Sequence, residues 1–251
     1  MACLYSPHSI VSLTNRNALT PAKDCYGTAR PLLRSARLRT TPSARSQPVV
    51  SSKFSFPNIF GNKASGTQKS RKKEVDAAKK DLLGLLEGSQ RGVVKVDRGE
   101  VEAVVDRFNE LQGDTPTTGA DLSGVWELMW TSEKEVLFLL EKGIFAVGPA
   151  QASYQVIDVD NGTLQNVITF GEDSESAFVV QSSLEPTSDV RVQFQFQGAE
   201  LRLPKRTFKI PPLGKGWFDT VYLDKTTRMA RDVRGDTGIY SRTNLPLDAF
   251  Q

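Results

Sequence analysis

The segment Gly216–Arg242 holds the charged side chains best suited to chemistry. Its carboxylates include Asp219 and Asp224, and its arginines include Arg228 and Arg231. Two neighbouring carboxylates can serve as general acid and base, as a lipid-modifying isomerase or de-epoxidase would require. Arginines so close in sequence instead favour ion pairs, and aspartates also cap turns. We therefore expect both aspartates to pair with arginines or cap turns rather than to catalyse a reaction.

Histidine and cysteine are confined to the N-terminal part of the chain. The only such residues are Cys3, His8 and Cys25. If that part is removed, the rest has no thiolate nucleophile, no His-assisted triad and no Cys/His zinc site. The sequence thus predicts no catalytic residue, no metal site and no cofactor, and indicates that the protein is not an enzyme.

A basic cluster lies in the stretch KRTFKIPPLGKG. Its cations are Lys205, Arg206, Lys209 and Lys215, interleaved with Phe208, Ile210 and Leu213. Cations mixed with apolar side chains suit lipid headgroups or an acidic partner. A solvated charged strand is the equal alternative. The stretch lacks the spacing and the following helix of a phosphate-binding loop.

The N-terminal segment has the composition of an import signal. Residues 1–73 contain 13 Lys and Arg but one acid, whereas residues 74–251 contain 19 basic and 28 acidic residues. A segment rich in Ser, Thr and Arg and poor in acids predicts a chloroplast transit peptide over residues 1–50, followed by a linker over 51–73. The alternative is a basic arm that binds nucleic acid. The acidic remainder argues against nucleic acid as a partner.

The elements that would position these side chains begin with the strand Leu122–Ser132. Its alternation predicts that Trp126, Leu128 and Trp130 share one face. Two amphipathic helices are expected before it, within residues 74–113, and the second has a capping pattern at Asp97. They would cover a barrel formed by the strands that follow. The alternative is that they lie on a lipid surface, which the acidic residues on the polar side of the second helix make less favourable.

Further strands follow at short spacing within residues 114–251. The expected strands are Ala152–Val159, Thr163–Phe170, Ser176–Leu184, Val190–Gln197, Leu201–Lys209, Trp217–Leu223, Arg228–Asp232 and Ile239–Arg242. An antiparallel set of this size either closes into a barrel or splits into a sandwich. Val136–Leu140 fits a short helix or a strand. This five-residue run is the longest purely apolar one, against about 20 residues needed to span a bilayer, so we expect any membrane association to be peripheral.

Aromatic residues recur on these strands. The candidates to line a cavity are Trp126, Trp130, Tyr154, Phe170, Phe178, Phe194, Phe196, Trp217 and Tyr222. Individually each suits a filled core, and together they suit a pocket for an elongated apolar molecule. Sequence alone does not separate a filled barrel from a hollow one.

The motifs LSGVWELMWTSE and GWFDTVYLD…TRMARDVRGDTG resemble the plastid lipid-associated proteins, or fibrillins, over Glu74–Arg242. The resemblance implies a mainly β, lipocalin-like antiparallel barrel of about eight strands preceded by two short helices. It implies a hollow interior and an arginine from the closing segment, among Arg228, Arg231 and Arg242, stacked over Trp126 to close one end. Ligand contact by such an arginine is the alternative role.

The expected function is non-covalent binding of prenyl lipids, carotenoids or fatty-acid-like molecules at plastoglobules or thylakoids in the chloroplast. The main alternative is an adaptor that docks a prenyl-lipid biosynthetic enzyme through its outer surface.

Overall fold

A computed structural model describes residues 64–144, 147–171, 175–211 and 214–251, with the side chains of 64–67 excepted. The predicted transit peptide and Leu213 lie outside the described residues. The helices are α1 (Ala64–Leu86), α2 (Arg98–Gln112), the 3-10 turn η1 (Ala120–Leu122) and α3 (Lys134–Lys142). The strands are β1 (Gly124–Thr131), β2 (Ala150–Asp158), β3 (Thr163–Phe170), β4 (Ser176–Pro186), β5 (Arg191–Leu203), β6 (Arg206–Ile210), β7 (Lys215–Leu223), β8 (Thr227–Asp232) and β9 (Thr237–Arg242).

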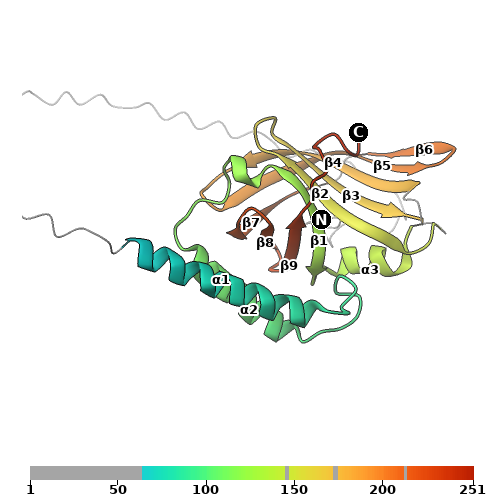
Figure 1. Cartoon of the computed structure of the whole chain (residues 1–251). Coiled ribbons are helices and arrows are strands. Elements are labelled where there is room, and N and C mark those ends of the chain that lie inside the picture. Colours follow the sequence, from blue (N-terminus) through green and yellow to red (C-terminus); the bar gives the residue numbers. More distant parts are fainter. Residues whose placement is uncertain (1–63, 145–146, 172–174, 212–213) are drawn as a thin grey trace, which may run out of the picture. The chain divides into compact units, whose positions relative to one another are not determined.

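The nine described strands form one antiparallel sheet that closes on itself (Figure 1). Its order is β4-β3-β2-β1-β9-β8-β7-β5-β6, and β4 also pairs with β5. Eight strands therefore make the ring, while β6 pairs only with the second half of β5. The first strand, β1, lies beside the last, β9. The predicted mainly β, barrel-like fold of about eight strands is confirmed.

One expected strand is divided by a turn. The expected strand Leu201–Lys209 is interrupted at Pro204 and Lys205, which turn the chain from β5 into β6. Proline cannot donate to a ladder, so a turn there leaves no strand hydrogen bond unmade. Val136–Leu140, open to either interpretation, belongs to α3, which buries Val136 and Leu140 and exposes Phe138.

A bulge in β1 changes which way its tryptophans face. The register against β9 shifts between Leu128 and Trp130. One extra residue reverses the alternation, so Trp126 and Leu128 point into the ring while Trp130 points outward beneath the helices. The predicted common face for the three residues is therefore wrong at Trp130.

The two leading helices cover the outer wall of the ring. Val101, Val105 and Phe108 of α2 are buried in a cluster with Tyr222 and Met229 on the outer faces of β7 and β8. The Asp97 carboxylate caps α2 by accepting from the backbone N–H of Gly99 and Glu100, as the capping pattern predicts. Packing on the barrel is thus the role of α2.

The start of α1 differs from the expected boundary. The helix begins at Ala64, inside the stretch 51–73 predicted as linker. The residues before Glu74 are polar but contain no proline, so a helix nucleated by the buried Ala78 and Leu82 can extend through them.

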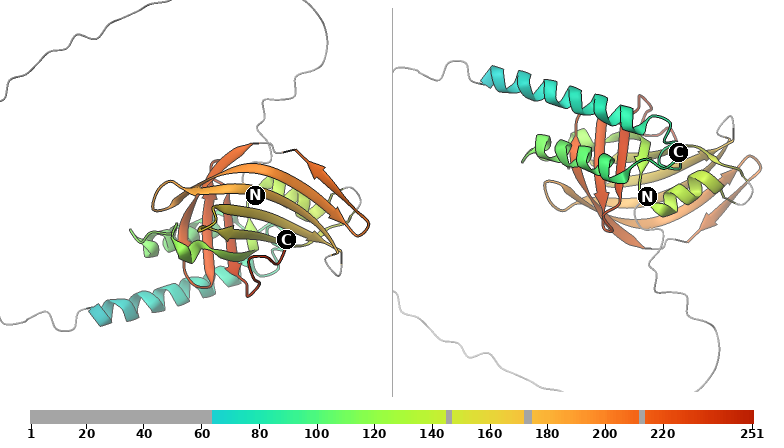
Figure 2. Two further views of the ribbon diagram at one scale, coloured as in Figure 1. Left: turned by 90° about the horizontal axis from the view of Figure 1, so that it is seen from above. Right: turned by 90° about the horizontal axis from the view of Figure 1, so that it is seen from below.

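The strand register defines two ends of the ring. Phe170, Ser176 and Arg202 lie at the end that carries α3, called the α3 end. Figure 2 shows α3 at the same end as β6. Gly124 and Ile157 lie at the opposite end, called the Trp126 end.

The C-terminal tail crosses the outer face of the sheet. Thr243 bonds to the Val125 carbonyl, the Phe250 ring packs 5.0 Å from the Tyr154 ring, and Arg202 donates to the Phe250 carbonyl. This tail helps to explain why outward-facing valines such as Val125 are buried.

Candidate functional site

The structure divides the nine candidate aromatic residues into three groups. Five lie in the buried cluster inside the ring, namely Trp126, Phe170, Phe178, Phe194 and Phe196. Two, Trp130 and Tyr222, lie outside the ring beneath α1 and α2. The remaining two, Tyr154 and Trp217, lie on the outer surface of the sheet. A bulge in β1 and another in β7 reverse the alternation of side chains, so Trp130 and Tyr222 point outward.

The two surface aromatics have specific partners. The Arg191 guanidinium stacks 3.6 Å from the Trp217 ring and donates twice to Asp219, at 2.7 and 2.8 Å. Asp219 therefore pairs with an arginine outside the closing segment. Tyr154 packs on Phe250.

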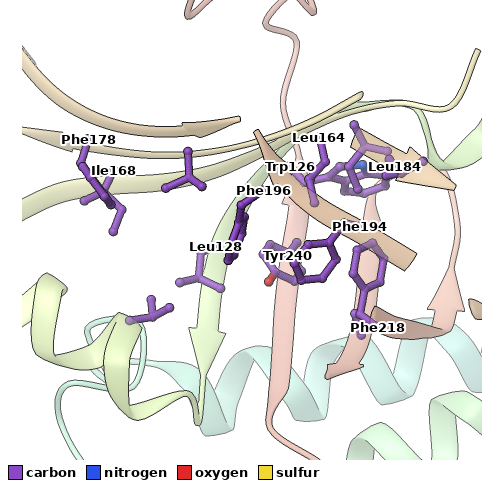
Figure 3. Close-up of a cluster of buried hydrophobic side chains, with 14 of the residues drawn as sticks. Trp126, Leu128, Leu164, Ile168, Phe178, Leu184, Phe194, Phe196, Phe218 and Tyr240 are labelled. Carbon is purple, nitrogen blue, oxygen red and sulfur yellow. The ribbon is translucent and has the colours of Figure 1, made fainter. Parts of the chain in front are cut away.

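The inside of the ring is densely packed along its length. Figure 3 shows Ile168 and Phe178 near one end and Leu184 and Phe218 near the other, with Trp126, Phe194 and Tyr240 between or beside them. Phe194 lies 5.5 Å from Phe196 and 6.3 Å from Phe218 between ring centroids.

A small chamber with polar walls interrupts this packing near α3. It is lined by Leu128, Thr131, Glu133, Val136, Ser153, Gln155, Asn166 and Tyr240, and its volume is about 10 Å³. That is room for about one water molecule. Within its wall, Gln155 donates to the Asn166 amide oxygen at 2.9 Å. Ser153 and Gln155 alternate with Tyr154 and Val156 on β2. The alternation in the sequence could therefore have predicted that these polar side chains share one face.

Arg242 closes the Trp126 end. Its guanidinium lies 4.1 Å from the Trp126 ring and donates to the carbonyls of Ser123, at 2.6 Å, and Asp121. The Trp126 indole N–H donates to the Leu122 carbonyl at 2.9 Å. A Cβ at Gly124 would lie 2.3 Å from an Arg242 nitrogen, so glycine provides the space that this closure needs.

Arg228 lies inside the ring and is fully buried. Its guanidinium is 4.1 Å from the Tyr240 ring, 5.4 Å from Phe218 and 5.6 Å from Trp126. It donates to the side-chain oxygen of Gln155. Burial lowers the pKa of Arg228 to about 10, so it remains a cation near neutral pH.

Arg231, by contrast, faces outward from the same strand. It donates to Glu102, at 3.0 Å, and to Asp106, at 2.7 Å, and so fastens α2 to β8. Of the three arginines considered for stacking on Trp126, Arg242 is in closest contact, Arg228 is more distant and Arg231 is elsewhere.

Asp224 caps the turn between β7 and β8. It accepts from the Tyr222 hydroxyl at 2.7 Å and from the backbone N–H of Thr226 at 2.8 Å, and it pairs with Lys79 of α1 at 2.6 Å. Burial alone would raise the pKa of Asp224, but these donors lower it to about 2. This carboxylate is thus held ionised as a structural anion.

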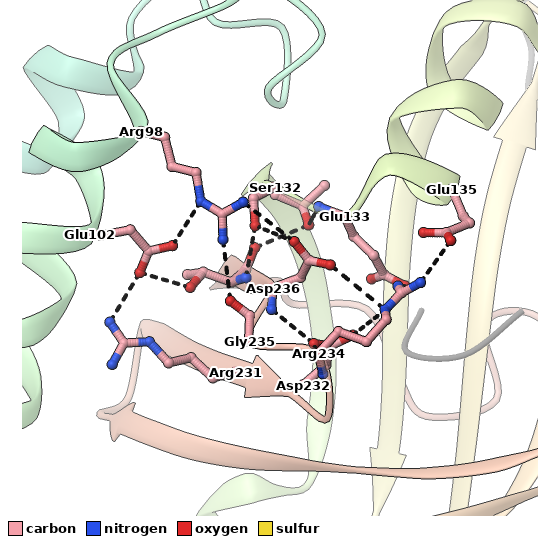
Figure 4. Close-up of polar contacts among 12 residues, drawn as sticks. Arg98, Glu102, Ser132, Glu133, Glu135, Arg231, Asp232, Arg234, Gly235 and Asp236 are labelled. Carbon is pink, nitrogen blue, oxygen red and sulfur yellow. Dashed lines mark hydrogen bonds and ion pairs between the residues drawn. The ribbon is translucent and has the colours of Figure 1, made fainter. Parts of the chain in front are cut away.

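An ion-pair network at the α3 end was missed from sequence (Figure 4). Arg234, in the turn after β8, reaches Glu135 at 2.7 Å, Glu133 at 3.2 Å and Asp232 at 3.3 Å. From the other side, Arg98 of α2 donates to the Gly235 carbonyl. Glu135 and Glu133 lie 99 and 101 positions from Arg234, so no local pattern in the sequence indicates these pairs.

The predicted basic cluster forms the β5–β6 hairpin and the start of β7. Lys205, Arg206, Lys209 and Lys215 are exposed, as are Phe208 and Ile210 between them. Leu201 pairs with Phe208 and Ala199 with Ile210, so the apolar side chains of β6 extend the inner face of β5. The cations and the apolar residues therefore lie together at the α3 end.

A wider groove lies outside the ring. It runs between the end of α1 and the outer side of β1, has a volume of about 660 Å³, and is lined by residues that include Leu83, Leu86, Arg91, Glu127 and Met129.

No helix among the residues described is long and apolar enough to cross a membrane.

Comparison with known proteins identifies the family. The sequence model of PAP_fibrillin matches residues 76–241. The chain belongs to the PAP/fibrillin family. This confirms the resemblance predicted over Glu74–Arg242.

PAP/fibrillin relatives agree on the location. The chain is 40% identical over 170 residues to the probable plastid-lipid-associated protein 11, chloroplastic, of Arabidopsis thaliana, covering 66% of this chain and 79% of that protein. It is 24% identical over 227 residues to the plastid-lipid-associated protein of Citrus unshiu, covering 69% and 70%. It is 30% identical over 143 residues to plastoglobulin-1 of Pisum sativum, covering 54% and 39%. These PAP/fibrillin names support the predicted chloroplast and plastoglobule location. No solved structure matches the chain.

Proposed function

We propose that this protein is a non-catalytic lipid-associated protein that docks peripherally on plastoglobules or thylakoids through its α3 end and binds a hydrophobic lipid non-covalently. The observation that carries the proposal is the joint exposure of apolar and basic side chains on the β5–β6 hairpin. The family membership supports lipid association in general, and the hairpin suggests where it occurs.

Both phenylalanines that are exposed among the described residues lie at this end. The Phe138 side chain of α3 is 61% exposed and Phe208 of β6 is 47% exposed, with Ile210 and Val233 exposed nearby. Large apolar side chains held in water at one end of a molecule gain free energy on entering a lipid interface, about 25 cal/mol for each Å² buried.

The charge at this end suits an anionic surface. None of Lys205, Arg206, Lys209 and Lys215 forms an ion pair within the described part of the chain, whereas most arginines of the barrel strands are paired. Each free cation near an anionic membrane contributes about 1 kcal/mol. The rest of residues 74–251 is acidic, so this end would orient the protein on the surface.

A prenyl lipid, carotenoid or fatty-acid-like molecule would enter from the same end. Phe170, Phe178 and Phe196 lie in the inner cluster that Val136 and Leu140 of α3 cap. Displacement of α3 would expose these rings to an apolar chain. Trp126 and Phe194 would then form the deep end of the site.

The carboxylates support a non-catalytic role. Asp219 is bound by Arg191, and Asp224 by Lys79 and Tyr222. A general base must be able to take up a proton, and the donors to Asp224 lower its pKa to about 2.

The test is flotation of the full chain with vesicles of phosphatidylcholine, with and without phosphatidylglycerol. Wild-type protein should float with the anionic vesicles. Replacement of Phe208 and Phe138 by Ser should abolish flotation, while the control Leu245→Ser, at an exposed site on the C-terminal tail, should float as the wild type does. Equal flotation of the Phe208/Phe138 variant would exclude this docking surface.

The adaptor function is the second candidate, and the dense packing inside the ring favours it. Its surface would be the outer wall rather than the α3 end. If a prenyl-lipid biosynthetic enzyme is captured from plastids equally by the wild type and by variants that fail to float, the adaptor function would be preferred.

A further inference from the structure

Arg228 presents an unmatched positive charge inside the ring. Its side chain is completely buried, and its Nε and Nη1 atoms have no hydrogen-bond partner among the described residues. Its side-chain acceptors are neutral: it donates to the Gln155 amide oxygen, and the Tyr240 hydroxyl also stabilises the cation. No acidic side chain in the described ranges pairs with it. Burying a charge without a counter-charge is costly, so such a group usually has a partner.

Other strand arginines show how this chain normally satisfies a guanidinium. Arg191 pairs with Asp219, Arg202 with Glu200, and Arg231 with both Glu102 and Asp106. All of them are more exposed than Arg228. Among these four strand arginines, the most deeply buried one is therefore the one without an acidic partner in the described part of the chain.

A purely structural role for Arg228 is already filled by another residue. Arg242 is the closer stack on Trp126, at 4.1 Å against 5.6 Å, and it alone bonds to the carbonyls that close this end. Arg242 is also positive, so it adds to the charge inside the ring rather than compensating for it. Tyr240 and Phe218 offer their ring faces to Arg228 but no negative charge.

We propose that Arg228 receives the carboxylate of a long-chain amphiphile whose apolar tail runs toward α3. The inference rests on the proposed lipid association for the source of the ligand, and it adds the chemical class of the head group. A carboxylate carries one negative charge, which matches this one cation. A phosphate monoester carries nearly two at neutral pH and would need a second free cation.

The polar layer beside Arg228 continues this site toward α3. Gln155 joins Arg228 to Asn166, and both amides line the chamber capped by Val136. The chamber holds about one water molecule, so the amphiphile enters only when α3 withdraws. Its tail then takes the space of Val136 and Leu140 against Phe178.

The first measurement needs no variant. The full chain is titrated with cis-parinaric acid and with its methyl ester, below the concentration at which either aggregates, and bound probe is followed by its fluorescence. The ester has the same chain without the charge. The acid should bind about tenfold to a hundredfold more tightly, as expected for a charge-assisted bond in a buried site. Equal affinity, or no binding of either, would overturn the proposal.

Two variants on one strand then assign the effect to Arg228. Arg228→Gln should lose the preference for the acid over the ester, while Arg231→Gln, on the opposite face of β8, should retain it. Retained preference in Arg228→Gln contradicts the proposal. If Arg228→Gln does not fold, the comparison of acid with ester in the wild type, repeated in Arg228→Lys, decides the matter: lysine keeps the charge and should keep the preference.

The unfolding temperature distinguishes a ligand-binding role of Arg228 from a structural one. An unmatched charge destabilises the empty protein, so Arg228→Met should unfold at the same temperature as the wild type or higher. A marked fall in Tm together with retained acid preference in Arg228→Lys and Arg228→Gln would identify a structural residue. Flotation on vesicles should be unchanged in Arg228→Gln, so failure of the carboxylate site is distinguishable from failure of surface docking.

Discussion

The guanidinium of Arg242 lies 4.1 Å from the ring of Trp126, although 116 positions separate the two residues in the chain. The contact joins β1 to β9, the first and last strands, where the ring closes. Gly124 lies beneath the guanidinium, and a Cβ there would approach an Arg242 nitrogen to 2.3 Å. Gly124, Trp126 and Arg242 thus close this end of the ring together, because the guanidinium fits over the indole only where residue 124 has no side chain.

Replacement of Gly124 by Ala should therefore weaken this closure. The added Cβ must displace the guanidinium or the strand, which should lower the free energy of unfolding by about 1–3 kcal/mol. Urea unfolding followed by tryptophan fluorescence measures the change. Gly113→Ala is the matched control, since its backbone φ is also positive, at +58°, and a Cβ there has no neighbour within 4 Å. Equal stability of Gly124→Ala and Gly113→Ala would contradict the closure.

The second prediction concerns the outer cluster beneath α2. Phe108 is fully buried and packs 4.7 Å from the Tyr222 ring. Phe108→Ala should cost about 3–5 kcal/mol, because it leaves a cavity between α2 and the sheet. Phe138→Ala, on the exposed side of α3, should leave the unfolding free energy nearly unchanged. A small effect of Phe108→Ala in the same urea titration would mean that α2 is not fastened to the ring in solution.

The ring could be predicted because its signals are local. Alternation located most strands, Asp97 marked the start of α2, and turn residues separated the hairpins. These patterns depend on neighbours within a few positions, where backbone preference is strong. The turn at Pro204 was missed because the apolar pattern continues through it.

The site was predicted less completely because its determinants are not local. A bulge of one residue moved Trp130 to the outer cluster, and alternation has no means of detecting it. Asp219 pairs with Arg191, 28 positions away, rather than with a nearby arginine. The isolation of Arg228 depends on what three-dimensional packing brings, or fails to bring, within reach.

Asp224 should make the free energy of unfolding depend on pH in the acid range. Its pKa is about 2 in the folded protein and about 3.9 in an unfolded chain. The carboxyl with the depressed pKa stabilises the fold above the unfolded value, and this contribution disappears as pH falls through the folded value. It amounts to about 2 kcal/mol near neutral pH, of which about half remains at pH 3.

Asp224→Asn should therefore be less stable than the wild type near neutral pH, and the difference should shrink between about pH 5 and pH 3. Urea unfolding at several pH values measures it. Asp114→Asn, at an exposed position, is the control. A constant difference between Asp224→Asn and the wild type would show that the ionised form is not the stabilising one.

Charge on the β5–β6 hairpin should set the affinity for anionic lipid. Lys205→Glu with Arg206→Glu removes two cations and adds two anions at the turn. Flotation on vesicles with phosphatidylglycerol should weaken by at least about 2 kcal/mol, and the loss should diminish as salt is raised. Lys95→Glu with Lys225→Glu makes the same change of net charge at exposed sites outside the hairpin. If both double variants weaken flotation equally, overall charge rather than the hairpin controls docking.

Arg234 should control how readily α3 leaves the ring. It bonds to Glu135 at 2.7 Å and to Glu133 at 3.2 Å, while it also reaches Asp232, so it fastens α3 to the turn after β8. Burial alone would lower the pKa of Arg234, but its hydrogen bond to Glu135 raises the pKa. The charged form of Arg234 is therefore stabilised in this network. Arg234→Gln should speed amide exchange in Lys134–Lys142 by about tenfold, the equivalent of 1.4 kcal/mol, and leave α2 protected. Arg98→Gln, which loosens the same turn from the α2 side, is the matched control and should affect α2 rather than α3. Unchanged exchange in α3 after loss of Arg234 would mean that Val136 and Leu140 alone hold the helix, and that a ligand must overcome only their burial to enter.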